Sequence, residues 1–451
     1  MNGMTYEKIK TIILTVLVLT SIVLTGALWT YQPKYDFMEN VDSDYIQNVS
    51  VSSNTQVDAG IIIRPSKILI HKDGKHYGIV QETEMNKLMK QVKKWSFDEF
   101  ENISSTVSKK DFLSFLHGKG KIEIIYPDDF PIEMYHYIFK IEDEGIQGVN
   151  FDRIVIPVEK EKEGIVYFVC MKDRKIYKAT VNNFSLQEIQ NTYYYQAEKY
   201  PRYFVYDIDV TKSLFIPEGP ITMNRLQYYT DELDPDKFKQ ALFSNPSFVK
   251  QDLLTNGEEY TDGSSLMKIN SMHKILSYVN PAAQRTLIQG QDPFLIQKSI
   301  DFVNEHGGWT DTYHFAEWDE KKRKVVFRLV KNSYPVFNAF GMSEVVPEWG
   351  DSEIINYSRP IFRLEIADRT NVSVQLPSGR EVVKQLKNMR WFEKKELVYD
   401  IVLGYELIRD SQRDKIVVLE PAWFCLYDGT WRKIVFKENE EIKRGDVIGL
   451  E

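Results

Sequence analysis

The sequence predicts an α+β fold: an N-terminal transmembrane helix, then a multi-domain extracytoplasmic body of mixed, mainly antiparallel sheets with packed helices. Three observations predict it. Residues 11–31 contain no charged side chain, and at about 1.5 Å per residue they span roughly 30 Å, the thickness of a hydrocarbon core. The remaining chain of about 420 residues is too long for one hydrophobic core. Its helical stripes are segregated among strand-like runs, which favours α+β over alternating strand–helix units.

The flanks of the apolar run predict its orientation. Lys8 and Lys10 precede it, and no comparable basic cluster follows it. The positive-inside rule therefore places the short tail in the cytoplasm and everything after the helix outside the membrane. Trp29 and Tyr31 fall at the outer end, where aromatic rings lie at the headgroup level. The alternative is a signal peptide cleaved after Ala27, but the run exceeds the usual h-region and has no A-x-A site.

Small and hydroxyl side chains give the predicted helix a face that can pack against another helix. Ser21 and Thr25 form a small-xxx-small pair, Gly26 is adjacent, and Thr11 and Thr15 repeat the spacing. Such residues let helices approach closely and exchange hydrogen bonds in lipid. The alternative is a plain anchor whose threonines hydrogen-bond to their own helix. The residues alone leave both interpretations open.

Charge and cysteine content exclude several classes of protein. The formal net charge is −8 and no Lys/Arg stripe occurs, so nucleic acid is not an expected partner. The two cysteines, Cys170 and Cys425, lie in apolar strand-like runs. We therefore expect two buried free thiols and not a disulfide scaffold.

The order of elements predicts a cytoplasmic tail, a helix, a connector and three domains. The divisions are residues 1–10 for the tail, 11–31 for the transmembrane helix, 32–60 for a polar connector, 61–217 for an N-terminal α+β domain, 218–305 for a central α+β domain and 306–451 for a C-terminal strand-rich α+β domain.

The N-terminal domain opens with β-branched runs that predict strands at residues 61–63 and 67–70. Asp73-Gly74 supplies hairpin turn chemistry before a further strand at 77–80. Apolar residues at helical spacing predict a helix over 84–95. The other expected elements are a helix at 111–116, strands at 121–126, 153–158, 165–171 and 175–181, and a helix that Ser185 caps and that runs to about residue 200.

Capping residues mark the helices of the central domain. Asp234-Pro235-Asp236 combines an N-cap, a proline at the first helical position and an acid in the first turn. Asp292-Pro293 opens a second helix, which Gly307-Gly308 ends. Between them, runs at 266–270 and 274–279 predict a hairpin.

The C-terminal domain is predicted to be mostly strands, with one helix over residues 378–389. The expected strands are 312–318, 324–330, 335–338, 354–357, 361–366, 397–408, 416–419, 422–427 and 431–436.

Histidines and carboxylates provide one group to test as a metal site. His306 and His314 lie near Glu305 and Glu317, but their spacing fits no compact zinc pattern. We expect instead a histidine pair that is solvated or lies at the edge of a core.

Other polar groups predict no chemistry. His71 and His76 bracket a turn, and the acids at 231–236 read as helix capping because they lack the glycine and closing glutamate of a calcium loop. The chain has no G-x-S-x-G, Walker A, H-E-x-x-H or G-x-G-x-x-G pattern. We therefore expect no catalytic, metal or cofactor site, although a carboxylate pair defined by spatial distance is invisible to sequence.

Tryptophans are concentrated in the C-terminal part, at positions 309, 318, 349, 391, 423 and 431. Exposed, they would be anchors for a protein partner or platforms for a sugar. Buried, they fill the core between sheet and helix. The turn residues and apolar strands around Trp309, Trp349 and Trp423 favour the core for these three.

The ordered set of segments along the chain resembles the YycH family of regulatory proteins from low-GC Gram-positive bacteria. The segments that carry the resemblance are the opening TYEKIKTIILTVLVLTSIVLTGALWTYQPKYD, DPDKFKQALFSNPSFV (234–249), FVNEHGGWTDTY (302–313), YPVFN (334–338), WGDSEIINYSRPIF (349–362), GYEL (404–407) and LEPAWF (419–424). No single motif is diagnostic. One local departure is Asn332-Ser333-Tyr334, where the family tends to have a glycine before the tyrosine.

The resemblance implies a single-pass membrane protein that acts with a sister protein, YycI, on the WalK (YycG) sensor histidine kinase of cell-wall metabolism. It implies contact with the kinase largely through transmembrane helices, a multi-domain α+β fold with a YycI-like C-terminal part, and no catalytic residues.

Three functions stay open on residues alone. The first is a regulatory accessory protein whose partners are the kinase, YycI, membrane lipid and a second copy of itself. The second is an extracytoplasmic module that binds cell-wall glycan or peptide. The third is an extracellular hydrolase with dispersed carboxylates. The resemblance favours the first.

Overall fold

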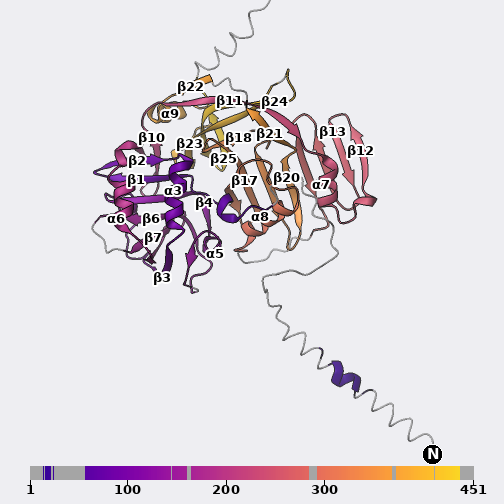
Figure 1. Ribbon diagram of the computed structural model, residues 1–451, viewed down its shortest axis with the longest axis horizontal. Helices are drawn as coiled ribbons and strands as arrows, with labels where there is room; N and C mark the ends of the chain where they lie inside the picture. The colour runs from indigo at the N-terminus through magenta and orange to yellow at the C-terminus, as the bar shows by residue number, and fades with distance from the viewer. Residues whose placement is uncertain are drawn as a thin grey trace, which may run out of the picture. The chain divides into compact units, whose positions relative to one another are not determined.

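The computed structural model describes residues 14, 16–21, 24, 56–143, 145–159, 164–283, 292–367, 372–410 and 412–436. The chain divides into two compact units, Met1–Gln47 and Asn48–Glu451. The second unit contains two large sheets with helices packed on them (Figure 1). The strands pair mainly antiparallel, and this confirms the predicted α+β class.

The first sheet contains ten of the described strands, in the spatial order β10-β9-β2-β1-β4-β6-β7-β8-β3-β5. Its neighbours pair antiparallel except for the parallel contact between β3 and β5. The strands are β1 (Lys67–Lys72), β2 (Lys75–Ile79), β3 (Ser96–Asn102), β4 (Lys121–Pro131), β5 (Lys140–Ile141), β6 (Asn150–Pro157), β7 (Ile165–Cys170), β8 (Lys175–Asn182), β9 (Arg202–Asp207) and β10 (Ser213–Pro217).

Local turn chemistry builds the β1–β2 hairpin as predicted. Lys72 pairs with Lys75 across a two-residue turn, and Asp73 and Gly74 both take positive φ angles, 50° and 73°. This is the geometry that Asp-Gly favours, because its twist matches that of the flanking strands. The strands predicted at 153–158, 165–171 and 175–181 are confirmed as β6, β7 and β8, which pair in sequence order.

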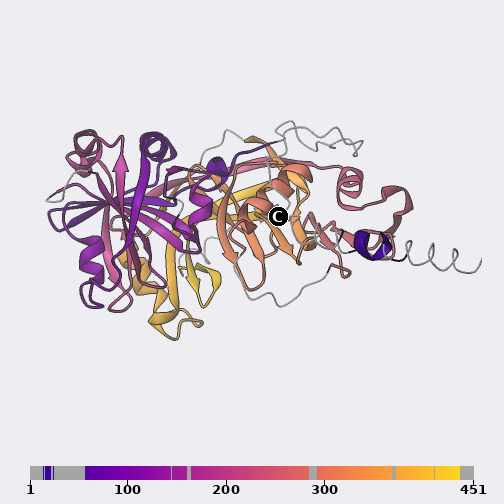
Figure 2. The same cartoon turned by 90° about the horizontal axis from the view of Figure 1, so that it is seen from below.

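Helices cover both faces of the first sheet, so both sets of alternating side chains are buried. On one face α3 (Glu82–Val92) contributes Leu88, Met89 and Val92 to the main core. On the other, α4 (Phe112–His117) packs Phe112 and Leu116 against β6, β7 and β8. The view in Figure 2 shows helices on either side of these strands.

Two predictions for the N-terminal domain need correction. The strand expected at 61–63 is wrong: α2 (Ala59–Ile62) is a helical turn there, followed by Ile63. Ile62 and Ile63 are buried where the turn packs against β16 (Tyr313–Asp319) and α8 (Leu295–Glu305), and this tertiary contact overrides β propensity. The helix capped by Ser185 is interrupted after α6 (Leu186–Ile189), becoming a π-helical turn and then a 3₁₀ turn.

The second sheet contains fifteen of the described strands. Its main path is β12-β13-β14-β15-β20-β19-β17-β18-β23-β24-β11-β21, and β16, β22 and β25 pair with β17, β11 and β24. The strands are β11 (Ile221–Glu232), β12 (Lys250–Leu254), β13 (Gly257–Thr261), β14 (Leu266–Asn270), β15 (Ile275–Val279), β16 (Tyr313–Asp319), β17 (Lys324–Lys331), β18 (Tyr334–Phe337), β19 (Glu344–Trp349), β20 (Ile354–Pro360), β21 (Phe362–Ala367), β22 (Val372–Leu376), β23 (Val398–Arg409), β24 (Ile416–Tyr427) and β25 (Thr430–Ile434).

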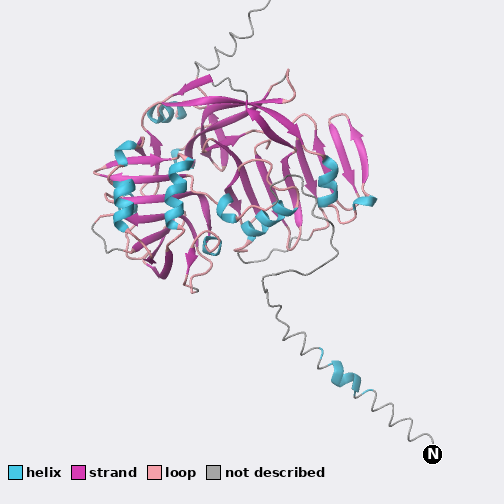
Figure 3. Ribbon diagram, viewed as in Figure 1, coloured by secondary structure: helices cyan, strands magenta, loops and turns pink. Residues whose placement is uncertain are grey.

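Polar side chains accept backbone N–H hydrogen bonds near the starts of the helices beside the second sheet, and Figure 3 draws the helices in cyan. Asp234 accepts a hydrogen bond from the Asp236 backbone N–H and opens α7 (Pro235–Leu242). α8 (Leu295–Glu305) starts three residues after Asp292, whose side chain accepts from the Phe294 N–H. α9 (Gly379–Leu386) carries a complete capping box. A further short helix, α5 (Ile132–Tyr135), directly follows β4 of the first sheet.

The main hydrophobic core draws side chains from both sheets. The predicted division of the body at residues 217 and 305 stays a prediction.

The capping box of α9 predicts a stability cost for Ser378→Ala. Ser378 Oγ accepts from the Glu381 N–H, and the Glu381 carboxylate accepts from the Ser378 N–H. We expect the alanine variant to lose about 1 kcal/mol of unfolding free energy, measured by chemical denaturation of the purified chain. Ser277→Ala, at an exposed strand position, is the control and should change stability by less than about 0.5 kcal/mol. Equal losses in both variants would contradict the capping role.

Candidate functional site

The predicted face of the transmembrane helix is described only in part. Leu14, residues 16–21 and Leu24 are helical and exposed. The Thr20 hydroxyl donates a hydrogen bond to the Val16 carbonyl oxygen at 2.7 Å. This bond to the preceding turn of its own helix is the one expected of a threonine in a plain anchor. Within these described residues and the described body, no helix is long and apolar enough to cross a membrane. Ser21 is among the described residues, and the other predicted positions lie outside them: Lys8, Lys10, Thr11, Thr15, Thr25, Gly26, Trp29 and Tyr31.

Polar contacts tie the two sheets together where β1, β9 and β10 face β18 and β23. Lys67 on β1 forms an ion pair of 3.5 Å with Asp400 on β23. The Glu82 backbone N–H, at the start of α3, donates to Ser333 Oγ at 2.9 Å. We call this region the junction. Its contacts join residues more than 250 positions apart, so only the folded chain assembles it.

A cleft of about 700 Å³ opens at the junction. Tyr203 and Phe215 of the first sheet line one side, and Tyr334 and Leu403 of the second line the other. The segment 217–222, which leads from β10 to β11, lines it as well. Small-molecule binding sites are typically clefts of about this volume, and they occur preferentially where two structural units meet.

Ion pairs hold the charged side chains at the cleft. Glu218 forms ion pairs with Arg202 at 3.3 Å and with Arg380 at 2.8 Å. The Arg380 guanidinium also lies 4.7 Å from the ring centre of Phe204. With its cations held by carboxylates and rings, the cleft presents mainly aromatic and apolar surface to an occupant.

Two adjacent acids on β4 connect the first sheet to β16. The Trp318 backbone N–H donates to the Asp128 carboxylate at 3.2 Å, and the indole N–H of Trp318 donates to the Asp129 carbonyl oxygen at 2.7 Å. Burial and the neighbouring Asp129 carboxylate raise the pKa of Asp128 well above the ordinary aspartate range. The protonated acid is therefore part of the contact at low pH.

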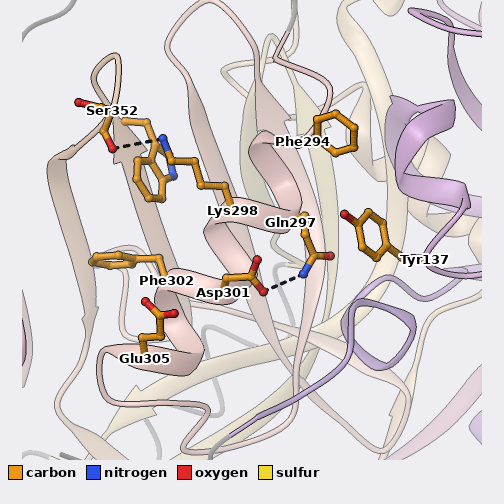
Figure 4. Close-up of a pocket in the computed structure, with 9 residues that line it drawn as sticks. Tyr137, Phe294, Gln297, Lys298, Asp301, Phe302, Glu305 and Ser352 are labelled. Atoms are coloured by element: carbon orange, nitrogen blue, oxygen red, sulfur yellow. Dashed lines mark hydrogen bonds between the residues drawn. The ribbon is translucent and has the colours of Figure 1, made fainter. Parts of the chain in front are cut away.

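A groove of about 450 Å³ follows one face of α8 (Figure 4). Gln297 donates to Asp301 at 2.8 Å, and Lys298 lies 4.0 Å above the Trp349 ring centre. Burial raises the pKa values of Asp301 and Glu305, and the nearby Asp301 charge adds to the effect on Glu305. Two exposed carboxyl groups beside aromatic rings suit an organic cation.

The predicted histidine pair near α8 does not form a metal-binding group. His306 stacks on Phe302 with ring centres 4.1 Å apart, and its Nδ1 lies 2.9 Å from the Phe302 carbonyl oxygen. Burial, with a smaller contribution from Arg64, lowers the pKa of His314 to about 4. Both are packed histidines.

A different group of side chains converges on the first sheet. Among the described residues, the histidine, cysteine and carboxylate side chains close enough to hold a metal ion are His71, His117 and Glu123. Sequence reasoning missed this group, because it saw His71 only as a turn neighbour of His76. The signal was weak: Glu123 is a charged residue within an otherwise apolar β-strand run.

The cysteines and the three selected tryptophans are packed as predicted. Cys170 and Cys425 are buried free thiols, and burial raises the pKa of each to about 12. Trp309, Trp349 and Trp423 are at most 6% exposed. These indoles therefore contribute to the core.

Comparison with known proteins identifies the family. The family model described as the YycH protein N-terminal domain matches residues 7–196. The model described as the YycH protein C-terminal domain matches residues 211–441. The chain belongs to the YycH family.

Relatives of this YycH family member agree over nearly the whole length. The chain is 28% identical over 438 residues to the two-component system WalR/WalK regulatory protein YycH of Bacillus subtilis (strain 168), covering 94% of this chain and 95% of that protein. It also matches the crystal structure of YycH from Bacillus subtilis with a TM-score of 0.72 and 25% identity, over 85% of this chain and 99% of that one. The predicted resemblance is thereby confirmed.

The elevated pKa of Asp128 predicts a pH dependence of stability. The folded chain retains a proton that the unfolded chain releases, so this contribution is fully present at low pH and is lost as pH rises toward the folded pKa. The unfolding free energy of the wild type should fall between about pH 5 and pH 8. We expect this fall to be smaller in Asp128→Asn by at least about 1.4 kcal/mol, the equivalent of one pKa unit.

The measurement is chemical denaturation at both pH values. The exposed Asp252→Asn, on β12, is the control and should keep the wild-type slope. A slope in Asp128→Asn that equals the wild-type slope would contradict the assignment.

Proposed function

We propose that this chain is a membrane-anchored, non-enzymatic regulator that, with YycI, modulates a WalK/YycG-type sensor histidine kinase controlling cell-wall metabolism. Membership of the YycH family, with the full-length similarity to a WalR/WalK regulatory protein, carries the proposal. In it, residues 1–10 are cytoplasmic, residues 11–31 span the membrane of a Gram-positive cell, and the body lies outside.

The proposed route of regulation is contact between helices, supplemented by contacts of the body. Ser21, Thr25 and Gly26 would pack against helices of the kinase and YycI, with Thr11 and Thr15 extending the face. Lys8, Lys10, Trp29 and Tyr31 would anchor the helix at the two lipid interfaces. Such a helix changes kinase activity only to the extent that it binds one kinase conformation more tightly than the other. Self-association through the same face belongs to the proposal.

The alternative is an extracytoplasmic module that binds cell-wall glycan or peptide. It needs exposed aromatic platforms, and three of the C-terminal tryptophans are instead packed in the core. Tyr137 and Phe294, about half exposed at the groove on α8, are the aromatic side chains that favour it. Family membership supports regulation more strongly.

The test is contact between the full chain and the sensor kinase of its own organism in a bacterial two-hybrid assay. We expect Ser21→Leu/Thr25→Leu/Gly26→Leu to reduce the signal at least about fivefold, the lower end of typical coupling between sites, because bulky side chains block close approach of the helices. Membrane levels of both proteins are measured alongside.

The matched control, Val16→Leu/Ile22→Leu/Val23→Leu, makes three leucine substitutions at positions that are already apolar and should keep the signal. Contact that survives the first triple change would move the interface away from the named face. Absence of contact with the kinase, even with YycI co-expressed, together with retention of the chain on purified cell wall, would overturn the regulatory proposal in favour of wall binding.

A further inference from the structure

A buried polar cluster lies on the α4-covered face of the first sheet. His71 is on β1, Glu123 is on β4, and His117 is the last residue of α4. Their side chains are 1%, 0% and 8% exposed. Three groups that can bind a metal ion therefore share one site, enclosed by a strand pair and a helix. We propose that His71, His117 and Glu123 bind a divalent transition-metal ion of the zinc type.

The three candidate ligand atoms converge. His71 Nε2 lies 2.6 Å from Glu123 Oε1, and His117 Nδ1 contacts the same oxygen. All three atoms lie within 4.8 Å of one another. Ligand atoms around tetrahedral zinc are about 3.3 Å apart when each bond is about 2.0–2.1 Å, so small shifts of side chains suffice to admit the ion. Two histidines and one glutamate form a known zinc-binding set, with water at the fourth position.

A surrounding layer already orients the ligands. His71 Nδ1 lies 2.6 Å from Nδ1 of His76, so in the ion-bound state the His71 tautomer with its proton on Nδ1 would donate to His76 and present Nε2 to the ion. The second Glu123 oxygen accepts from Arg153 at 2.9 Å, and Arg153 is held in turn by Asp152 at 2.8 Å. Partners of this kind fix the tautomer and ring orientation of metal-binding histidines.

Charge around the cluster is compatible with a cation. Glu123 and Asp152 each carry one negative charge and Arg153 carries one positive charge, so these three side chains have a net charge of about −1. Lys121, on the same strand as Glu123, contributes one positive charge, although its ammonium is directed to the Phe115 carbonyl oxygen and lies 4.3 Å from the Phe115 ring centre. A bound divalent ion would thus meet a neutral to slightly negative surrounding.

One ring nitrogen of His117 has no hydrogen-bond partner among the described residues. His117 Nε2 is buried, and no group among the described residues hydrogen-bonds it. Because the ring can be rotated to exchange its two nitrogens, either one can be turned toward an ion. Buried polar atoms without partners are rare in native proteins, and a bound ion is one of the partners that satisfies such an atom.

Access to the cluster runs past one aromatic ring. Phe215 of β10 packs on the rings of His71, His76 and His117, with centre-to-centre distances of 5.3, 4.9 and 4.7 Å. The same Phe215 lines the junction cleft. Rotation of this side chain would open a route from the cleft to the ligands, and its normal position keeps the site apolar on that side.

The experiment measures metal binding by the full chain, purified in detergent and stripped with a chelator. Added Co²⁺ should give the visible absorption of a tetrahedral ion and should saturate at about one ion per chain. Zn²⁺ should displace the Co²⁺ and raise the melting temperature of the protein. His117→Asn should weaken binding by more than the roughly 10–100-fold expected from loss of an orienting partner. His76→Gln, at a half-buried position, should weaken it by about 10–100-fold.

His314→Asn is the matched control, because it removes a buried histidine outside the cluster and should keep wild-type affinity. Circular dichroism checks that each variant is folded. His76→Gln leaves the ligands in place and keeps the test valid if His117→Asn does not fold. Wild-type protein that fails to take up Co²⁺ or Zn²⁺, or variants of His117 and His76 that bind as tightly as His314→Asn, would overturn the proposal and leave a hydrogen-bonded cluster only.

Discussion

Long-range pairing of β24 is the constraint on which the body depends. β24 pairs with β23 along nearly its whole length, with β11 on its other side, and with β25 at its end. β11 lies almost two hundred positions earlier in the chain, so closing this pair carries a large loop-entropy cost that burial of the sheet must offset. Because only residues 218–220 separate β11 from β10, the same pairing anchors the edge of the first sheet against the second. The junction and its cleft follow from that short connection.

Buried carboxyl groups show how neighbours decide the state of an acid. Burial opposes ionisation of both Glu123 and Asp128. Around Glu123, His117 and His71 donate hydrogen bonds and hold its pKa well below the ordinary range, and Arg153 compensates the charge. Asp128 has a second acid beside it, so its pKa is raised. The energetic difference comes from partners, since an unpaired buried charge is far more costly than a paired one.

The polar cluster and the cleft are physically contiguous. Phe215 contacts three histidine rings on one side and lines the cleft at the junction on the other. Coupling between distant parts of a protein needs an element with two arrangements that both parts bias, and the structure gives one arrangement of Phe215, packed on the histidine rings. If the cluster binds an ion as proposed, Phe215 is the side chain that lies between that site and the cleft where the two sheets meet.

Local signals predicted much of the secondary structure. The Asp73-Gly74 turn and the Asp234 cap depend on residues within about four positions. The same reasoning failed at residues 61–63, where packing against β16 and α8 selects a helical turn. Family membership was also readable from sequence, because it rests on an ordered series of segments.

Some features that bear on function are readable from the sequence, and others appear only in the tertiary structure. The sequence by itself determined the apolar segment at residues 11–31, its basic N-terminal flank, the α+β class and the family, all of which are encoded in composition and short spacings. Only the tertiary structure decided that His71, His117 and Glu123 share a site and that Phe215 separates them from a cleft. The register of β1 against β4, with His71 opposite Lys121, brings together side chains 52 positions apart, and no local pattern encodes such a distance.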